Sequence, residues 1–140
     1  MTDCPFCNLQ KEQTRIIRIT ELTTVLLSNP RLMPGHTLVV PKRHVEKPWE
    51  LTTNEIQAIF EDIFWIEVKL LENGAEGCDI RQNYRPFLAQ SKIKINHVHF
   101  HVLPRTNKDE LYKKSMKFEA DLFKDLSNTE RQEMARLLKD

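Results

Sequence analysis

The sequence predicts an α+β domain, in which an antiparallel sheet of about five strands has one long helix packed on it and a helical extension follows at the C-terminal end. Three observations support this fold class. Short segments of β-branched and aliphatic residues recur at strand length. One central segment carries apolar side chains at helical spacing. The length of 140 residues is enough for a single core.

The expected strands are short and are bounded by turn or breaker residues. The turn Met33-Pro34-Gly35 precedes one strand, and Pro41 ends it, because proline donates no hydrogen bond to a sheet. The last strand carries the histidines discussed below. The five strands are residues 15–19, 23–27, 36–40, 78–83 and 92–103, with a loop over residues 84–90 before the last one.

Two helices are expected. Thr52 or Thr53 caps the first and longer one, Glu55 lies in its first turn, and Asn73-Gly74 ends it. Residues 127–130 (SNTE) form a capping box that begins the second, C-terminal helix. The apolar residues of the long helix follow helical spacing and are interpreted as core; they are Ile56, Ile59, Phe60, Ile63, Phe64, Leu70 and Leu71.

The composition argues against several classes of protein. With 21 basic and 20 acidic residues the net charge is +1, so no overall field attracts nucleic acid or an anionic membrane. No apolar run approaches the roughly 18–20 residues of a membrane span, and the N-terminal residues do not resemble a signal peptide. Three cysteines, an odd number, argue against a disulfide framework. We therefore expect a cytoplasmic protein without nucleic-acid or membrane partners.

All five histidines fall in two segments, and three of them, His97, His99 and His101, alternate with apolar residues. On a strand, alternate side chains point to one face, so these rings would form a row. An apolar strand gains nothing from three titratable rings on one side. The cluster therefore indicates chemistry, such as metal ligation, acid–base catalysis or attack on phosphorus.

Residues 97–105 (HVHFHVLPR) resemble the signature of the histidine triad (HIT) family of nucleotide hydrolases and transferases. Two further segments are similar to the family, residues 34–44 (PGHTLVVPKRH) and residues 4–7 (CPFC), so that the resemblance covers residues 4–105. The resemblance implies the HIT-like fold, a nucleotide substrate and a homodimer whose sheets join across a two-fold axis.

The resemblance ends near the point where the chain turns polar, after Pro104. We expect a HIT-like domain over residues 1–106, which includes an N-terminal segment that the resemblance implies to bind zinc. Residues 107–140 are expected to be a helical extension packed on the same domain, because apolar residues such as Phe118 and Phe123 recur in it.

His99, the middle histidine of the run, is the candidate nucleophile. A neutral imidazole attacks an α-phosphorus without a separate base and leaves again when water attacks the nucleotidyl-histidine, which divides one difficult substitution into two easier ones. The resemblance implies the same role, with release of a nucleoside monophosphate from a dinucleoside polyphosphate or a nucleoside phosphoramidate. His101 and His36, if protonated, would stabilise charge on the phosphate; otherwise His36 is an ordinary turn residue.

Asn83, Gln90 and Ser91 match a family pattern that hydrogen-bonds the phosphate and the leaving group, because Asn83 lies seven residues before the Gln-Ser pair. Relatives usually carry this pair three or four residues before the first histidine, whereas Gln90 lies seven residues before His97. We expect the extra residues 92–94 to lengthen the strand and to move Ser91 out of the site.

The small, glycine-rich approach that is usual before this pair is also missing, and residues 84–87 (YRPF) take its place. Glycines there let backbone amides approach a phosphate closely. Two interpretations stay open: Arg85, Lys92 or Lys94 supplies charge in their place, or these side chains are simply solvated.

Family members often carry an Asp or Asn about eight residues before the histidine of Pro-Gly-His, where it binds the ribose hydroxyls. Ser28 stands at that distance from His36, and Asn29 is next to it. Either Ser28 or Asn29 binds the ribose, or the two belong to an ordinary turn before Pro30.

Cys4 and Cys7 have the spacing of half a tetrahedral zinc site, a spacing that alone also fits a redox pair. Some bacterial HIT proteins bind a structural zinc through such a pair, the histidine of a Pro-Lys-x-His segment and the first triad histidine. The resemblance therefore implies Cys4, Cys7, His44 and His97 as zinc ligands. Zinc at this place would hold the N-terminus to the catalytic strand and leave the other two triad histidines free.

Three other functions fit parts of the sequence. A metalloenzyme would hold a catalytic zinc on two or three of the triad histidines, although few carboxylates lie near the run to support them. A non-catalytic nucleotide sensor or adaptor would bind a nucleotide and signal through a dimer surface. A phosphorylase of diadenosine tetraphosphate would use phosphate in place of water.

Overall fold

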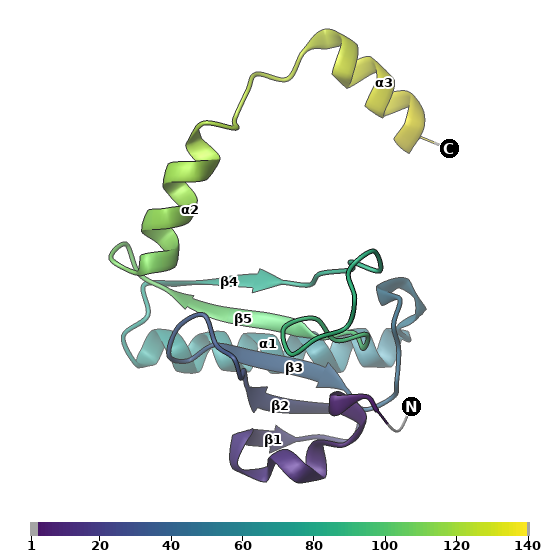
Figure 1. Ribbon diagram of the computed structural model, residues 1–140, viewed down its shortest axis with the longest axis vertical. Coiled ribbons are helices and arrows are strands. Elements are labelled where there is room, and N and C mark those ends of the chain that lie inside the picture. Colours follow the sequence, from purple (N-terminus) through teal and green to yellow (C-terminus); the bar gives the residue numbers. More distant parts are fainter. Residues whose placement is uncertain (1–2, 140) are drawn as a thin grey trace. The chain divides into compact units, whose positions relative to one another are not determined.

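In the computed structural model, which describes residues 3–139, the chain divides into two compact units, Met1–Asn107 and Lys108–Asp140. The first unit contains one five-stranded antiparallel sheet with a long helix, α1 (Thr53–Glu72), packed on it (Figure 1). The α+β fold class predicted from the sequence is therefore confirmed. In the spatial order of the sheet, the strands are β1 (Ile16–Ile19), β2 (Thr23–Leu27), β3 (Thr37–Pro41), β5 (Phe100–Arg105) and β4 (Gly77–Arg81).

The last strand differs from the sequence prediction, because the expected strand over residues 92–103 is wrong at its beginning. β5 starts only at Phe100. Residues 91–94 form a turn instead, in which the Ser91 N–H donates to the Lys94 carbonyl at 2.8 Å. The three extra residues therefore do not lengthen the strand, since their backbone groups bond within the turn and not to the sheet.

α1 packs on one face of the sheet through its apolar stripe. Thr52, one of the two predicted caps, is the N-cap of α1. Its Oγ1 accepts a hydrogen bond from the Glu55 N–H at 3.1 Å, and the Glu55 carboxylate accepts one from the Thr52 N–H at 2.9 Å. The predicted end at Asn73 is also confirmed. Each large apolar side chain buried in such a layer contributes about 1.5–3 kcal/mol. The layer's buried residues are Val25, Val39, Ile59, Ile63, Ile66 and Val102.

The N-terminal segment contributes a second buried cluster, on the other side of the sheet from α1. The N-terminal segment contains two 3-10 helices, η1 (Pro5–Cys7) and η2 (Leu9–Arg15). A third 3-10 helix, η3 (Pro48–Glu50), lies elsewhere and precedes α1. Residues in register across all five strands share this side of the sheet, which we call the histidine face. The row in register is Ile16, Leu26, Leu38, His101 and Arg81.

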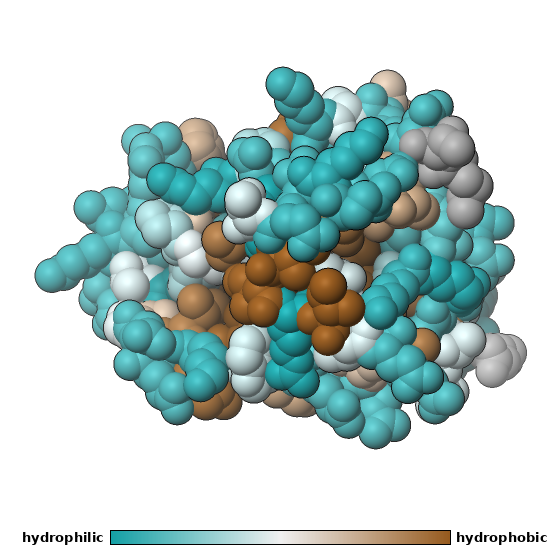
Figure 2. Space-filling model, turned by 90° about the horizontal axis from the view of Figure 1, so that it is seen from below, coloured by the Kyte–Doolittle hydropathy of each residue, from teal (hydrophilic) through white to brown (hydrophobic). Residues whose placement is uncertain are grey.

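β1 is one edge of the sheet, and it leaves apolar surface uncovered. Figure 2, which views the molecule from the side of β1, shows apolar side chains gathered near the centre of that face. Ile17 and Ile19 of β1 are 47% and 57% exposed. Arg18 between them turns toward α1, where its guanidinium lies 4.7 Å from the ring centre of Trp65 and pairs with the buried Asp62. The Arg18 side chain, which packs on α1, thus lies between the two exposed isoleucines in the sequence of β1.

The second unit consists of two helices, α2 (Glu110–Ala120) and α3 (Asn128–Leu138). The Ser127 capping box and the helix that it begins are as the sequence predicts. None of the residues of α2 and α3 is buried. Over residues 3–139, no helix combines the length and the apolar character that crossing a membrane requires.

Candidate active site and metal centre

His36 and His101 form a directly bonded pair on the histidine face. His101 lies in β5, and His36 directly precedes β3 after the Gly35 turn, where φ is +91°. The Leu32 N–H donates to His36 Nδ1 at 3.1 Å, so His36 carries its proton on Nε2 when neutral. That Nε2–H donates to His101 Nδ1 at 2.8 Å. The remaining donor of the pair is therefore the Nε2–H of His101.

The environment of this pair keeps both rings neutral near pH 7. Burial, together with the charge of Arg81 and the neighbouring His99, lowers the pKa of His36 to about 4. Burial also lowers the pKa of His101 to about 3, with further contributions from His99, His36 and two arginines. The two rings thus differ from the protonated groups considered in the sequence analysis, and they act through hydrogen bonds instead of through full positive charges.

His99 has one ring nitrogen fixed by the backbone and the other left to react. Its Nδ1–H donates to the His97 carbonyl at 2.7 Å, which leaves the lone pair on Nε2. Burial lowers the pKa of His99, so the ring is neutral near pH 7. Its ring centre lies 4.9 Å from that of His101 and 5.0 Å from that of Phe6. This is the arrangement that an imidazole nucleophile requires.

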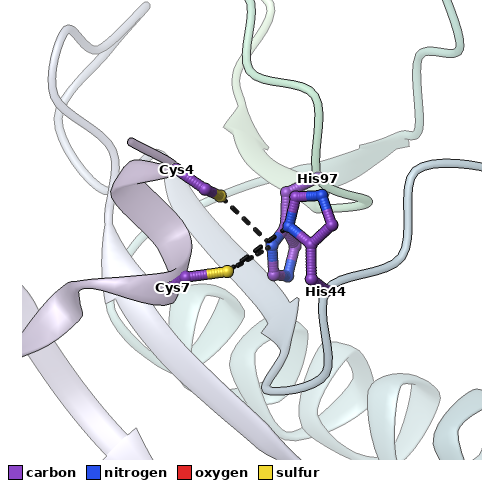
Figure 3. A group of neighbouring side chains, drawn as sticks. All are labelled: Cys4, Cys7, His44 and His97. Atoms are coloured by element: carbon purple, nitrogen blue, oxygen red, sulfur yellow. Dashed lines mark hydrogen bonds between the residues drawn. The ribbon is translucent and has the colours of Figure 1, made fainter. Parts of the chain in front are cut away.

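A second group of side chains comes together on the histidine face, beside the N-terminal segment (Figure 3); it consists of Cys4, Cys7, His44 and His97. Their ligand atoms all lie within 4.8 Å of one another. Cys4 Sγ lies 3.4 Å from His97 Nδ1, and Cys7 Sγ lies 3.3 Å from His44 Nδ1 and 3.7 Å from His97 Nδ1. Two sulfurs and two imidazole nitrogens are a donor set of structural zinc sites.

The second nitrogen of each imidazole supports the fit to zinc. His97 Nε2–H donates to the Pro41 carbonyl at 2.8 Å, and His44 Nε2–H donates to the Glu46 carboxylate at 3.0 Å. Both bonds leave Nδ1 with its lone pair toward the sulfurs, as in metal sites, where ligating histidines donate their other N–H to a carbonyl or a carboxylate. Within residues 3–139 this is the one group of three or more such residues with ligand atoms close enough for a metal ion.

The predicted phosphate-side residues lie in the loop between β4 and β5. Asn83 Oδ1 accepts from the Arg85 guanidinium at 3.5 Å, and Asn83 lines a cavity of about 80 Å³ that His97 also borders. Gln90 Oε1 accepts from the Asn96 N–H at 3.0 Å. Ser91 Oγ accepts from a backbone N–H within its own turn. No hydrogen bond joins Asn83, Gln90 or Ser91 to a triad ring among the residues that the structure describes.

The two candidate ribose residues lie in the turn that leads to His36. The Ser28 N–H donates to the His36 carbonyl at 2.9 Å, so the start of this turn adjoins the site. The Ser28 hydroxyl donates to the Pro30 carbonyl at 2.7 Å, as expected of a turn serine. Asn29 is exposed. The structure thus brings Ser28 next to the histidine pair through the backbone, with its hydroxyl bonded within the turn.

Two residues that the sequence analysis did not select belong to this face. Phe6, the second residue between the two cysteines, is buried with its ring edge against His97 and His99. Arg81 is the register partner of His101. The alternation of residues along the strand could have indicated which residues share a sheet face with Arg81. The sequence does not reveal which residue of a neighbouring strand lies opposite a histidine.

A family model for the HIT domain matches residues 9–108, and the chain belongs to the HIT family. The chain is 28% identical over 108 residues to an adenosine 5′-monophosphoramidase of Schizosaccharomyces pombe, an alignment that covers 76% of this chain and 77% of the relative. It is 30% identical over 108 residues to a bis(5′-adenosyl)-triphosphatase of Dictyostelium discoideum, with coverages of 71% and 69%.

Among solved structures, the chain is similar to a zinc-bound histidine triad family protein from Mycobacterium smegmatis. The TM-score is 0.67 at 26% identity, and the match covers 79% of this chain and 80% of the other. The two relatives described above are named for different activities, one on an adenosine phosphoramidate and the other on a triphosphate-bridged dinucleoside.

Proposed function

We propose that this protein is a nucleotide hydrolase or transferase that acts at an α-phosphate through a nucleotidyl-His99 intermediate. The observation that carries the proposal is the fixed tautomer of His99, whose Nδ1–H is held by the His97 carbonyl while Nε2 keeps its lone pair beside His101. The dinucleoside polyphosphates and the nucleoside phosphoramidates named for relatives are the two substrate classes considered.

The proposed reaction has two displacements at phosphorus. The lone pair of His99 Nε2 attacks the α-phosphorus, and the bond to the leaving group breaks with its electron pair on the leaving atom. A polyphosphate leaves as its anion, and the nitrogen of a phosphoramidate leaves as an amine after taking up a proton from solvent. The Nε2–H of His101 donates a hydrogen bond to a phosphoryl oxygen as charge develops there. Water then attacks the phosphorus, the N–P bond breaks, its electron pair returns to Nε2, and a proton is released to solvent with the nucleoside monophosphate.

We further propose that the cluster of Cys4, Cys7, His44 and His97 holds a structural zinc ion. Zinc there would supply folding energy by joining the N-terminal segment to the residue that precedes the nucleophile by two positions. His99 and His101 lie outside this group of ligands. That separation favours a nucleophilic histidine over a catalytic metal on the triad, because the first triad histidine has its Nδ1 turned to the cysteines.

The test is to incubate the protein with diadenosine tetraphosphate and, separately, with adenosine 5′-phosphoramidate, and to follow release of AMP, ADP and ATP. We expect AMP release from at least one substrate, and a fall of about a thousand-fold or more in the His99→Ala variant, since the nucleophile is lost. AMP release that persists in His99→Ala contradicts the proposal. Binding of AMP without any turnover identifies a nucleotide sensor instead.

A phosphorylase forms the same intermediate, so the same assay is repeated with inorganic phosphate added. Attack by phosphate in place of water converts the AMP product from diadenosine tetraphosphate into ADP. A proportion of ADP that rises with phosphate concentration assigns the protein to the phosphorylases. Constant AMP assigns it to the hydrolases.

A further inference from the structure

Arg81 lies beside the histidine pair on the histidine face. It is the last residue of β4 and the register partner of His101 in β5. Register partners in an antiparallel pair point to the same face, with Cβ atoms about 4.5–5.5 Å apart. The half-buried Arg81 side chain therefore extends from the position next to His101, the ring that accepts a hydrogen bond from His36.

Neither Arg81 nor its neighbour Arg85 forms an ion pair with a carboxylate in the part of the chain that the structure describes. Each of the ion pairs found there involves other residues. Asp79, two positions earlier on the same strand, pairs with Arg105 instead. A partly buried guanidinium without a counter-charge favours the binding of an anion, and its planar fork suits phosphate oxygens.

The charges of both arginines reach the reactive rings. After burial, the charge of Arg81 is a further cause of the low pKa values of His36 and His101, and that of Arg85 contributes at His101. Arg85 also donates to Asn83 Oδ1 at 3.5 Å, which holds it on the loop that follows β4. Two cations near the end of one strand thus act on the His36–His101 pair, which lies beside the proposed nucleophile.

The loop between β4 and the histidine run has no glycine that could bind a phosphate through backbone amides. The three glycines of the chain are Gly35, Gly74 and Gly77, so none lies between β4 and the histidine run to bring backbone amides close to a phosphate. A phosphate leaving group departs as an anion, which guanidinium groups stabilise. The amine that leaves a phosphoramidate carries no negative charge for a guanidinium group to bind.

We infer that Arg81, assisted by Arg85, binds the phosphates of the leaving group, and that the site selects nucleoside polyphosphates over phosphoramidates. This inference rests on the proposed function and names its substrate class. It assigns to two arginines of this chain the recognition that a glycine-rich loop would otherwise provide.

The experiment compares kcat/KM for diadenosine tetraphosphate and for adenosine 5′-phosphoramidate in the wild type, Arg81→Gln and Arg81→Lys. We expect the ratio of the two values to fall about ten- to a hundred-fold in Arg81→Gln, the size of a lost charge-assisted hydrogen bond. Arg81→Lys restores part of the ratio. The matched control is Lys69→Gln, which removes one exposed positive charge from α1 on the other face of the sheet; its ratio stays within about two-fold of the wild type.

A ratio that does not change in Arg81→Gln, with turnover of both substrates intact, overturns the inference and leaves the proposed function standing. A binding measurement separates the two further. ATP, which has the form of the leaving group, is titrated into the wild type and into Arg81→Gln, both confirmed as folded by circular dichroism. Weaker ATP binding in the variant supports the anion site even if no substrate is turned over, whereas equal binding contradicts it.

Discussion

At the scale of single residues, the positions of three imidazole protons decide what the site can do. The Leu32 N–H directs the proton of His36 to Nε2, and this Nε2–H donates to His101 Nδ1, which keeps the proton of His101 on its own Nε2. The His97 carbonyl fixes the proton of His99 on Nδ1. Each ring is thus set by a backbone group, directly or through one neighbour, so the Nε2 lone pair of His99 and the Nε2–H of His101 are both preorganised.

We expect His36 and His101 to stay neutral between about pH 8 and pH 5, because burial lowers their pKa values to about 4 and about 3. Proton NMR of the Cε1–H resonances checks this expectation, and an inflection near the ordinary histidine value of about 6.5 in either ring contradicts it. Unfolding returns both rings to that value, so the unfolded chain binds more protons below it. The free energy of unfolding attributable to the pair therefore decreases as the pH falls from about 6.5 toward 4.

The sequence indicated the histidines and the candidate metal ligands because each belongs to a short motif with its own chemistry. His99 and the cluster of Cys4, Cys7, His44 and His97 required no knowledge of the fold beyond the family resemblance. Gln90 was harder to place, since a three-residue insertion changes its spacing and only the structure shows the insertion as a turn. Arg81 was missed because its importance arises from strand register, which no local motif encodes.

At the scale of elements, the short helix η1 connects the proposed metal centre to the proposed nucleophile. Phe6 lies between the two cysteines in sequence, and its ring meets His97 edge-on with centres 5.8 Å apart and His99 with centres 5.0 Å apart. The segment that carries two of the proposed zinc ligands therefore also packs against the reactive imidazole. Loss of order in η1 would remove the Phe6 ring from its contact with His99.

We expect the wild type to bind about one zinc ion per chain, measured by elemental analysis, and the Cys4→Ser variant to bind almost none. The melting temperature should fall in the variant and in chelator-treated wild type, because structural zinc contributes folding free energy. Cys78→Ser is the matched control, since Cys78 packs beside the α1 layer, away from the cluster. Zinc retained in Cys4→Ser, or absent from the zinc-supplied wild type, contradicts the assignment.

The elements that the sequence predicted well are those with local signals at both ends. β2 begins and ends where the aliphatic run 23–27 does, and α1 has both its cap at Thr52 and its end at Asn73. The start of β5 was predicted eight residues before its observed position at Phe100. The reason is that the alternating histidines have strand spacing whether or not a partner strand lies beside them. Strand formation depends on tertiary pairing, and residues before Phe100 have no register partner in β3 or β4.

At the scale of the whole molecule, β4 is an edge strand of the sheet and α1 has exposed apolar side chains at Phe64, Val68 and Leu71. Both features are compatible with the homodimer that the family resemblance implies, which stays a prediction for sedimentation equilibrium to measure. The packing of residues 107–140 on the domain and the cytoplasmic location also stay predictions. The α+β domain itself was predictable, because one sheet and one amphipathic helix satisfy each other's apolar faces.

The central claim, a covalent nucleotidyl-His99 intermediate, is tested most directly by the steric course at the α-phosphorus. A nucleotide substrate made chiral at that phosphorus with sulfur and oxygen isotopes is hydrolysed, and the configuration of the product is determined. Two successive in-line displacements, by His99 Nε2 and then by water, predict overall retention of configuration. Inversion would show a single direct attack by water and would contradict the account.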